Sequence, residues 1–157
     1  MATWNDFESD APELAELGRS VLYRTGEGLA LLATVRGSEM PPRIHPVNVE
    51  IVDGSLLTFI HADSAKARDL IADGRCAVHA HQDPQIPHEF QARGRAAQVT
   101  DPEERARAAS RWPFTTDETY LLFEFALEHV LVGRRPSPND WPPVYRSWKV
   151  PTAEPVA

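Results

Sequence analysis

Alternating apolar and polar positions dominate the middle of the chain and predict a β-hairpin there. Every second side chain is apolar over residues 47–51, and a second apolar run follows over residues 56–60. Asp53-Gly54, between the two runs, is typical of a two-residue hairpin turn. A helix is expected over residues 64–73 and should close at Gly74. The pattern therefore predicts a strand, a turn, a strand and then a helix.

The remaining segments predict further strands and two more helices. Asp10 and Glu13 have the spacing of a capping box, so a helix should begin at Pro12 and end near Gly26. A second box, Asp101 with Glu104, predicts a helix that ends at about residue 112. The additional strands are expected at residues 29–35, 76–81, 89–99, 120–132 and 144–150, with a helix as the alternative for residues 120–132.

Two residues should interrupt these strands. Pro46 lacks the N–H that a sheet partner would use, so it belongs at an edge, or at a gap that a ligand fills. Gly94 predicts a β-bulge in residues 89–99. No regular alternation of strand and helix is present, so the pattern favours a mainly β fold, an antiparallel barrel with helices, in one domain over residues 1–157. The ends, residues 1–9 and 151–157, are expected to be flexible.

Composition narrows the class of protein. The formal net charge of −7 argues against a nucleic-acid partner or a membrane surface, both of which require a basic face. The single cysteine, Cys76, allows no internal disulfide, and no apolar run approaches the ~18 residues of a membrane span. We therefore expect a cytoplasmic protein with neither a nucleic-acid nor a membrane partner.

A local anion site is predicted where the hairpin meets the helix. Ser64 and Lys66 fall in the first turn, where backbone N–H groups also point outward, and Arg43 begins the preceding strand. A lysine at this end of a helix is mildly unfavourable with the helix dipole, unless an anion lies between them. These three residues together indicate a phosphate site.

Other kinds of site find little support. His79 and His81 share a face of a predicted strand, but no carboxylate or cysteine stands beside them at ligand spacing, so we expect no metal site. A Gly-x-Ser-x-Gly nucleophile elbow is absent, which disfavours a serine hydrolase.

The order of motifs over about residues 12–133 resembles the pyridoxamine 5′-phosphate oxidase-like superfamily, the FMN-binding split barrels. The matching pieces are LALLATVRG, PRIHPVNVEIVDG, LLTFIHADSAKARDLIADGRCAVH and EFQARGRAAQVTD. The resemblance implies a six-stranded antiparallel split β-barrel, a homodimer and a flavin bound at the subunit interface. It assigns the phosphate to Arg43, Ser64 and Lys66, and the flavin ring to His45, Pro46, Val47, Thr58, Phe59 and Ile60.

The resemblance leaves the activity open. Pyridoxamine phosphate oxidases end in an Arg-x-His element that binds substrate, whereas this chain has Trp148 after Arg146-Ser147. Relatives with a similar pattern bind a deazaflavin coenzyme or haem. We therefore expect an FMN-dependent oxidoreductase without a named catalytic acid or base, the alternatives being a deazaflavin-dependent reductase and a non-catalytic flavin- or haem-binding protein.

Overall fold

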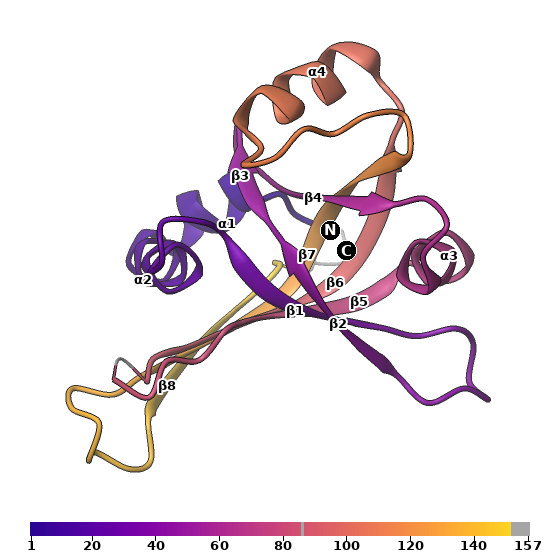
Figure 1. Ribbon diagram of the computed structural model, residues 1–157. Helices are drawn as coiled ribbons and strands as arrows, with labels where there is room; N and C mark the ends of the chain where they lie inside the picture. Colours follow the sequence, from indigo (N-terminus) through magenta and orange to yellow (C-terminus); the bar gives the residue numbers. More distant parts are fainter. Residues whose placement is uncertain (86, 152–157) are drawn as a thin grey trace, which may run out of the picture.

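One antiparallel β-sheet, curled into a barrel, forms the body of the computed structural model, which describes residues 1–85 and 87–151 (Figure 1). Within these residues the strands are hydrogen-bonded in the order β2-β1-β5-β6-β7-β4-β3, and β8 pairs with β7. Their bounds are β1 Leu29–Thr34, β2 Arg43–Asn48, β3 Glu50–Val52, β4 Ser55–His61, β5 Arg75–Ala80, β6 Glu89–Val99, β7 Tyr120–Arg134 and β8 Val144–Lys149. The predicted mainly β split barrel is confirmed.

The described strands exceed the expected six for two local reasons. The first arm of the predicted hairpin divides at Val49 into β2 and β3, and β8 is added along the far half of β7. β2 lies at an edge of the sheet, where the missing N–H of Pro46 removes no bond to a second neighbour.

The central hairpin forms as its sequence predicts. Val52 lies opposite Ser55, and both turn residues have positive φ, 50° at Asp53 and 82° at Gly54. These dihedral signs are those of the two-residue turn that matches the twist of paired strands. The hairpin therefore places β4 directly before the next helix.

β6 and β7 form the longest pairing of the sheet, and it contains the predicted bulge. The register shifts between Arg93 and Gly94. A Cβ atom on Gly94 would lie 1.9 Å from the carbonyl oxygen of Ala126, so only glycine fits this approach. The helix alternative for residues 120–132 is wrong, because this segment pairs as a strand along its whole length.

Four helices accompany the sheet in the described part of the chain: α1 Trp4–Asp10, α2 Pro12–Leu22, α3 Ala65–Ala72 and α4 Pro102–Arg111. In Figure 1, α1 and α2 lie on one side of the barrel, α3 on the opposite side and α4 across one end. α3 begins at Ser64 and is followed by Gly74 at φ 76°, as predicted. Asp101 caps α4 and accepts hydrogen bonds from the backbone N–H groups of Glu103 and Glu104.

The N-terminal segment differs from the expectation. Residues 4–10 form α1 rather than a flexible end, because Thr3 and Asp6 make a capping box and Trp4 and Phe7 are fully buried. The box predicted at Asp10 does not form. Ala11 is the N-cap of α2 and has no polar side chain to make a cap bond, while the Asp10 carboxylate accepts from another residue, Trp148.

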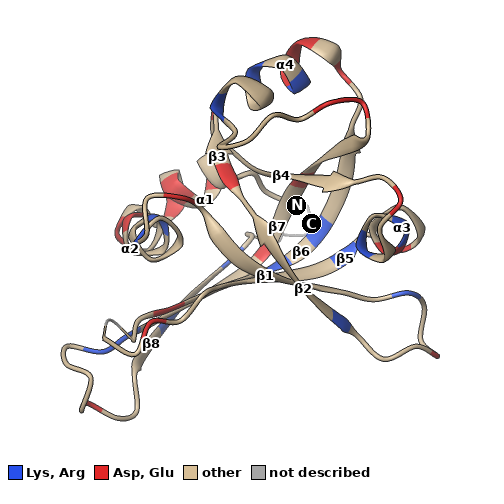
Figure 2. Ribbon diagram, viewed as in Figure 1, with Lys and Arg blue, Asp and Glu red and all other residues tan. Residues whose placement is uncertain are grey.

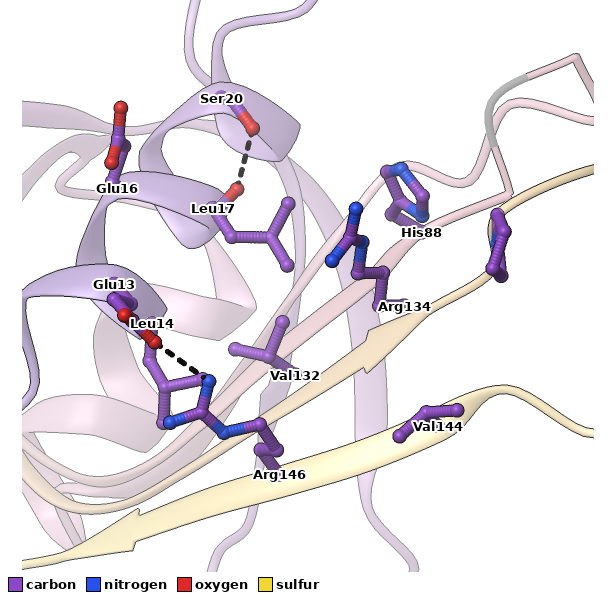
Figure 3. Close-up of a pocket in the computed structure, with 11 residues that line it drawn as sticks. Glu13, Leu14, Glu16, Leu17, Ser20, His88, Val132, Arg134, Val144 and Arg146 are labelled. Atoms are coloured by element: carbon purple, nitrogen blue, oxygen red, sulfur yellow. Dashed lines mark hydrogen bonds and ion pairs between the residues drawn. The ribbon is translucent and has the colours of Figure 1, made fainter.

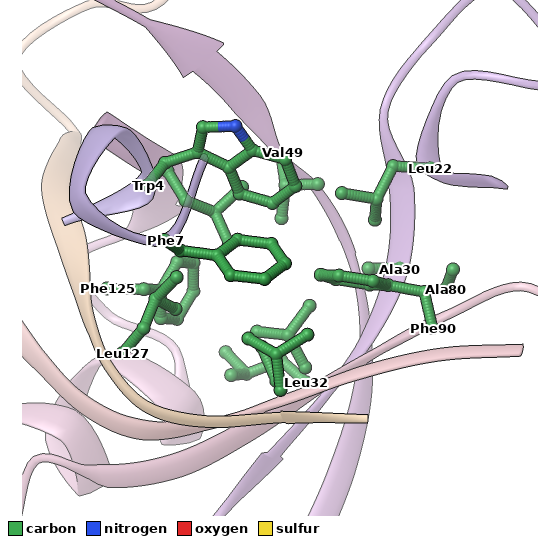
Figure 4. Packing of buried hydrophobic residues seen from close by; sticks show 14 of the residues in the cluster. Trp4, Phe7, Leu22, Ala30, Leu32, Val49, Ala80, Phe90, Phe125 and Leu127 are labelled. Carbon is green, nitrogen blue, oxygen red and sulfur yellow. The ribbon is translucent and has the colours of Figure 1, made fainter. Parts of the chain in front are cut away.

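Two groups of apolar side chains stabilise the fold. Trp4 and Phe7 of α1 meet Phe90 of β6 and Leu32 of β1 in the main core inside the barrel (Figure 4). A smaller core beneath α4 contains Val52, Leu57, Phe59, Ala108, Trp112 and Leu122. Of the expected flexible tail, residues 152–157 lie outside the described residues.

Acidic and basic segments are interspersed over the ribbon (Figure 2). Among the described residues, no helix is both long and apolar enough to cross a membrane.

Candidate anion site

The N-terminus of α3 directly follows the end of β4. The Ser64 backbone N–H donates to the His61 carbonyl oxygen at 3.0 Å, which turns the chain out of the strand. The Ser64 side chain accepts from the Ala67 N–H at 3.2 Å, and the first turn carries Lys66 and no acidic residue. The positive end of the helix dipole is therefore not neutralised by an acidic side chain in that turn.

A carboxylate that the sequence reasoning missed lies beside this helix start. Asp69 is only 1 % exposed, and its Oδ2 atom accepts a 2.9 Å hydrogen bond from the Thr34 hydroxyl. Its Oδ1 atom lies 2.9 Å from Nη2 of Arg36, and Oδ2 lies 3.8 Å from Nε of Arg43. We call Thr34, Arg36, Arg43, His45 and Asp69 the Asp69 cluster.

Strand register explains why these residues meet. Thr34 of β1 lies opposite Arg43 of β2, and Leu32 lies opposite His45, so all four side chains point to one face. α3 packs against β1 and presents Asp69 there, together with the buried Ala67 and Leu70. The available signal was a single acidic residue three positions after Lys66, hence on the same side of α3.

The pKa of His45 is affected by the neighbouring cations Lys66 and Arg43. Its Nε2 atom lies 3.3 Å from the Thr34 hydroxyl oxygen. Burial lowers the pKa of His45, the charges of Lys66 and Arg43 lower it further, and Asp69 opposes them. Of the residues that the sequence assigned to the site, the structure thus brings Arg43, His45 and Lys66 together, and Ser64 caps the helix that carries Lys66.

The other residues assigned to the flavin ring lie in two different places. Pro46 is exposed and lies opposite Leu31 on the outer face of the sheet, whereas Val47 is buried opposite Ala30 in the main core. Of these two residues, therefore, only Pro46 has an exposed side chain that a ligand could contact.

The three assigned residues of β4 are all buried. The Thr58 hydroxyl donates to the Asn48 carbonyl oxygen at 2.8 Å, and Ile60 belongs to the main core. The Phe59 ring packs edge-on against Trp112 at a centroid distance of 4.9 Å. Their side chains are used within the fold, so the backbone of β4 is what remains for contact with a ligand.

The C-terminal strand takes part in the core rather than in the anion site. Trp148 is buried, its ring lies 5.2 Å from that of Phe7, and its Nε1–H donates to Asp10 at 3.2 Å. Arg146 pairs with Glu13 at 3.0 Å. Figure 3 shows this pair beside a cavity of about 780 Å³ between α2, β7 and β8, lined by none of the residues assigned to the site.

His79 and His81 do not belong to a group of potential metal ligands in the described part of the chain. His79 lies on β5, where its Nδ1 atom is 2.7 Å from the Ala80 carbonyl oxygen. Across residues 1–85 and 87–151, no three His, Cys, Asp or Glu side chains come close enough together to hold a metal ion.

Comparison with known proteins decides the family. The family model for pyridoxamine 5′-phosphate oxidase matches residues 22–130, which include β1 to β7 as far as Val130 and therefore the whole anion site. The chain belongs to this family. None of the curated proteins matches the chain.

Solved structures share the family fold. The protein Atu2129, of unknown function, from Agrobacterium tumefaciens is 25% identical with a TM-score of 0.63; the alignment covers 78% of this chain but 57% of that one. A haem-binding protein from Mycobacterium smegmatis is 14% identical (TM-score 0.61, 85% of this chain and 57% of that chain). PhzG from Burkholderia lata, solved with tetrahydrophenazine-1-carboxylic acid, is 13% identical (TM-score 0.58, 91% and 95%). The chain therefore spans little more than half the length of two of these three proteins.

Proposed function

We propose that this protein is a flavin-dependent oxidoreductase that binds FMN through its phosphate at the start of α3. The observation that carries the proposal is that Arg43 and Lys66 both act on His45 and that Arg43 reaches Asp69 of α3, the helix that Ser64 caps, in a chain of net charge −7. A buried phosphate loses its water and needs cations and N–H donors in exchange. This helix start supplies both.

The residues fit the cofactor in two parts. Arg43, Ser64 and Lys66 would hold the phosphate. His45 and Pro46, with the backbone of β4, would border the ring, since Phe59 and Ile60 are packed in the cores and the buried Thr58 hydroxyl is bonded to Asn48. When bound, a flavin supplies hydride-transfer chemistry itself, so the protein has only to bind, orient and shield it.

The same proposal includes a homodimer with the flavin between subunits. On the outer face of the sheet, Leu31 and Ala33 of β1 lie beside Ile44 and Pro46 of β2, and Ile44 is 68% exposed. Because Ile44 and Pro46 alternate along β2 with Arg43 and His45, this apolar surface and the anion site lie on opposite faces of the same edge strand. A second subunit that packs on the outer face and around the edge of β2 would also cover the ring.

Oxidation of pyridoxamine phosphate is not part of the proposal. The residue in place of the expected substrate-binding histidine, Trp148, is buried against Phe7. The substrate is instead a small molecule that reaches the flavin at the subunit interface.

An absorbance spectrum of the purified protein, followed by anaerobic titration with NADPH, tests the proposal. We expect a bound flavin spectrum that bleaches on reduction and returns when an electron acceptor is added. A deazaflavin spectrum would redirect the proposal to the related coenzyme, and a haem spectrum or flavin that cannot be reduced would favour a non-catalytic binding protein. A protein that neither retains nor binds any of these groups would contradict the proposal.

A further inference from the structure

We infer that Arg36 is a third cation of the anion site and that Asp69 is the residue that positions it, together with Arg43. This inference rests on the proposed flavin function, because it concerns the ligand of the same site. Neither residue was assigned a role by the sequence or by the resemblance to the family.

The first observation is the shared carboxylate. Asp69 is 99% buried and is approached by two guanidinium groups, that of Arg36 from the β1–β2 connection at 2.9 Å and that of Arg43 from the start of β2 at 3.8 Å. The Thr34 hydroxyl also donates to Asp69, at 2.9 Å, and anchors the carboxylate. Asp69 is thus an anchored acceptor that the two arginine side chains share.

The second observation is the exposure of the cations. The Arg36 and Arg43 side chains remain 42% and 37% exposed although their shared partner is buried. A guanidinium group has five N–H donors, and an ion pair with one carboxylate uses at most two of them. Each arginine therefore keeps donors for a second acidic ligand outside the protein core.

The third observation is the charge of the group. Arg36, Arg43 and Lys66 against the one carboxylate of Asp69 leave a formal charge of +2. The first turn of α3 adds the positive end of a helix dipole and no acidic side chain. A phosphate monoester carries about −1.5 to −2 charges at neutral pH, so it balances this group, whereas a single carboxylate ligand does not.

Arg36 also has a purely structural role available to it. The Gly37 N–H donates to Asp73 at 3.0 Å, so the β1–β2 connection is tied to α3 at two neighbouring points. If Arg36 served only as such a tie, its loss would change stability and leave phosphate recognition unaltered. The two roles are separated by comparing FMN with riboflavin, which lacks the phosphate.

The test is a fluorescence titration of FMN and of riboflavin into the full-length protein and two matched variants. Arg36→Ala should weaken FMN binding about tenfold and leave riboflavin unchanged. Arg107→Ala removes an arginine of similar exposure that pairs with Asp53, and it should change neither ligand. Equal effects of Arg36→Ala on both ligands would overturn the inference.

The positioning role of Asp69 is tested by a double-mutant cycle that combines Arg36→Ala with Asp69→Asn. In an Asp69→Asn background, Arg36→Ala should change FMN affinity less than about threefold, because Arg36 is no longer held in place. A full tenfold effect in both backgrounds would show that Asp69 does not position Arg36. If Asp69→Asn fails to fold, Thr34→Val serves as the second background, since it removes the hydroxyl that anchors Asp69 and leaves every charge intact.

A second experiment, with inorganic phosphate in place of a flavin, distinguishes failure of this inference from failure of the proposed function. If the protein binds no flavin, the proposed function fails, and inorganic phosphate then decides the inference through the midpoint of thermal unfolding. Phosphate should raise the midpoint of the wild-type protein and of Arg107→Ala by more than that of Arg36→Ala. Equal stabilisation of all three, or none in any, would overturn the inference.

Discussion

His45 donates a hydrogen bond to Thr34. The Thr34 hydroxyl gives its only hydrogen to Asp69, so its oxygen, 3.3 Å from Nε2 of His45, is left as the acceptor. The neutral His45 ring therefore carries its hydrogen on Nε2. The bond links a residue assigned to the flavin ring to the carboxylate that contacts the arginines.

This arrangement predicts the titration of His45. Burial and the charges of Lys66 and Arg43 lower its pKa below the ordinary 6.5, while Asp69 raises it. Arg43→Ala should therefore raise the pKa of His45, and Asp69→Asn should lower it further. Ring resonances followed by NMR against pH measure both changes, with Arg107→Ala as the control that moves neither.

The lowered pKa of His45 also makes the stability of the fold depend on pH. Because the pKa of His45 is lower in the folded than in the unfolded chain, the unfolded chain takes up the proton first as the pH falls. The stabilisation by neutral His45 should be complete above pH 6.5 and be lost as the pH falls from 6.5 through the folded pKa. A stability profile that rises on acidification across this window would contradict the assignment.

The phosphate contacts can be tested with single substitutions. Lys66→Ala and Arg43→Ala should each weaken FMN by about ten- to hundredfold, because loss of a charged hydrogen bond costs roughly 1.5–3 kcal/mol. Riboflavin should be affected less. Unchanged FMN affinity in both variants, measured by fluorescence titration, would place the phosphate elsewhere.

The proposed dimer depends on the exposed side chain of Ile44. Ile44→Glu should give a folded monomer, because a charge on this face opposes burial against a second subunit, while the isolated subunit already exposes the position. Ile71→Glu, at an isoleucine of similar exposure on α3, is the control and should remain dimeric. Sedimentation velocity distinguishes the two, and a wild-type protein that is monomeric at micromolar concentration would refute the dimer.

We expect no pyridoxal phosphate production at about one turnover per second or faster. The reason is chemical: the indole of Trp148 has one N–H, already donated to Asp10, and no acceptor atom. The assay is aerobic incubation with pyridoxamine phosphate and added FMN. A rate typical of an enzyme would show that the substrate is bound by other residues.

Trp148 should matter for stability instead. Trp148→Ala removes a buried ring from contact with Phe7 and should lower the free energy of unfolding by about 3–5 kcal/mol. Trp141, which is 74% exposed, is the matched control, and Trp141→Ala should change it by only about 0.5 kcal/mol. Urea unfolding followed by circular dichroism measures both, and equal effects would contradict the packing of Trp148.

The elements around the anion site were predictable because their signals are local. Alternation, the Asp53-Gly54 turn and the Ser64 cap each act within a few residues, so the hairpin and α3 follow from the sequence alone. The bulge at Gly94 was equally accessible, because glycine marks a close backbone approach.

The residues that support the site were not predictable in this way. Helical spacing from Lys66 does not separate Asp69, which is buried, from Asp73, which pairs with Arg75 at the end of α3, because residues three and seven positions further on share one side of a helix. The difference arises only when β1 and β2 pair and bring Thr34 and Arg43 to the same face. Likewise, α1 was missed because a seven-residue helix has little periodicity, and its stability comes from burial of its two aromatic rings.

β7 is shared between two neighbours along one edge. Its first half, Tyr120–Phe125, pairs with β4 and closes the barrel, and its second half, His129–Arg134, pairs with β8. The anion site depends on the barrel, whereas the strand that carries Trp148 pairs with the far half of β7 and contacts the N-terminal helices through Trp148 and Arg146. The fold is therefore modular: substitutions in the terminal strand can change the surface beside α2 while the strands that form the anion site stay as they are.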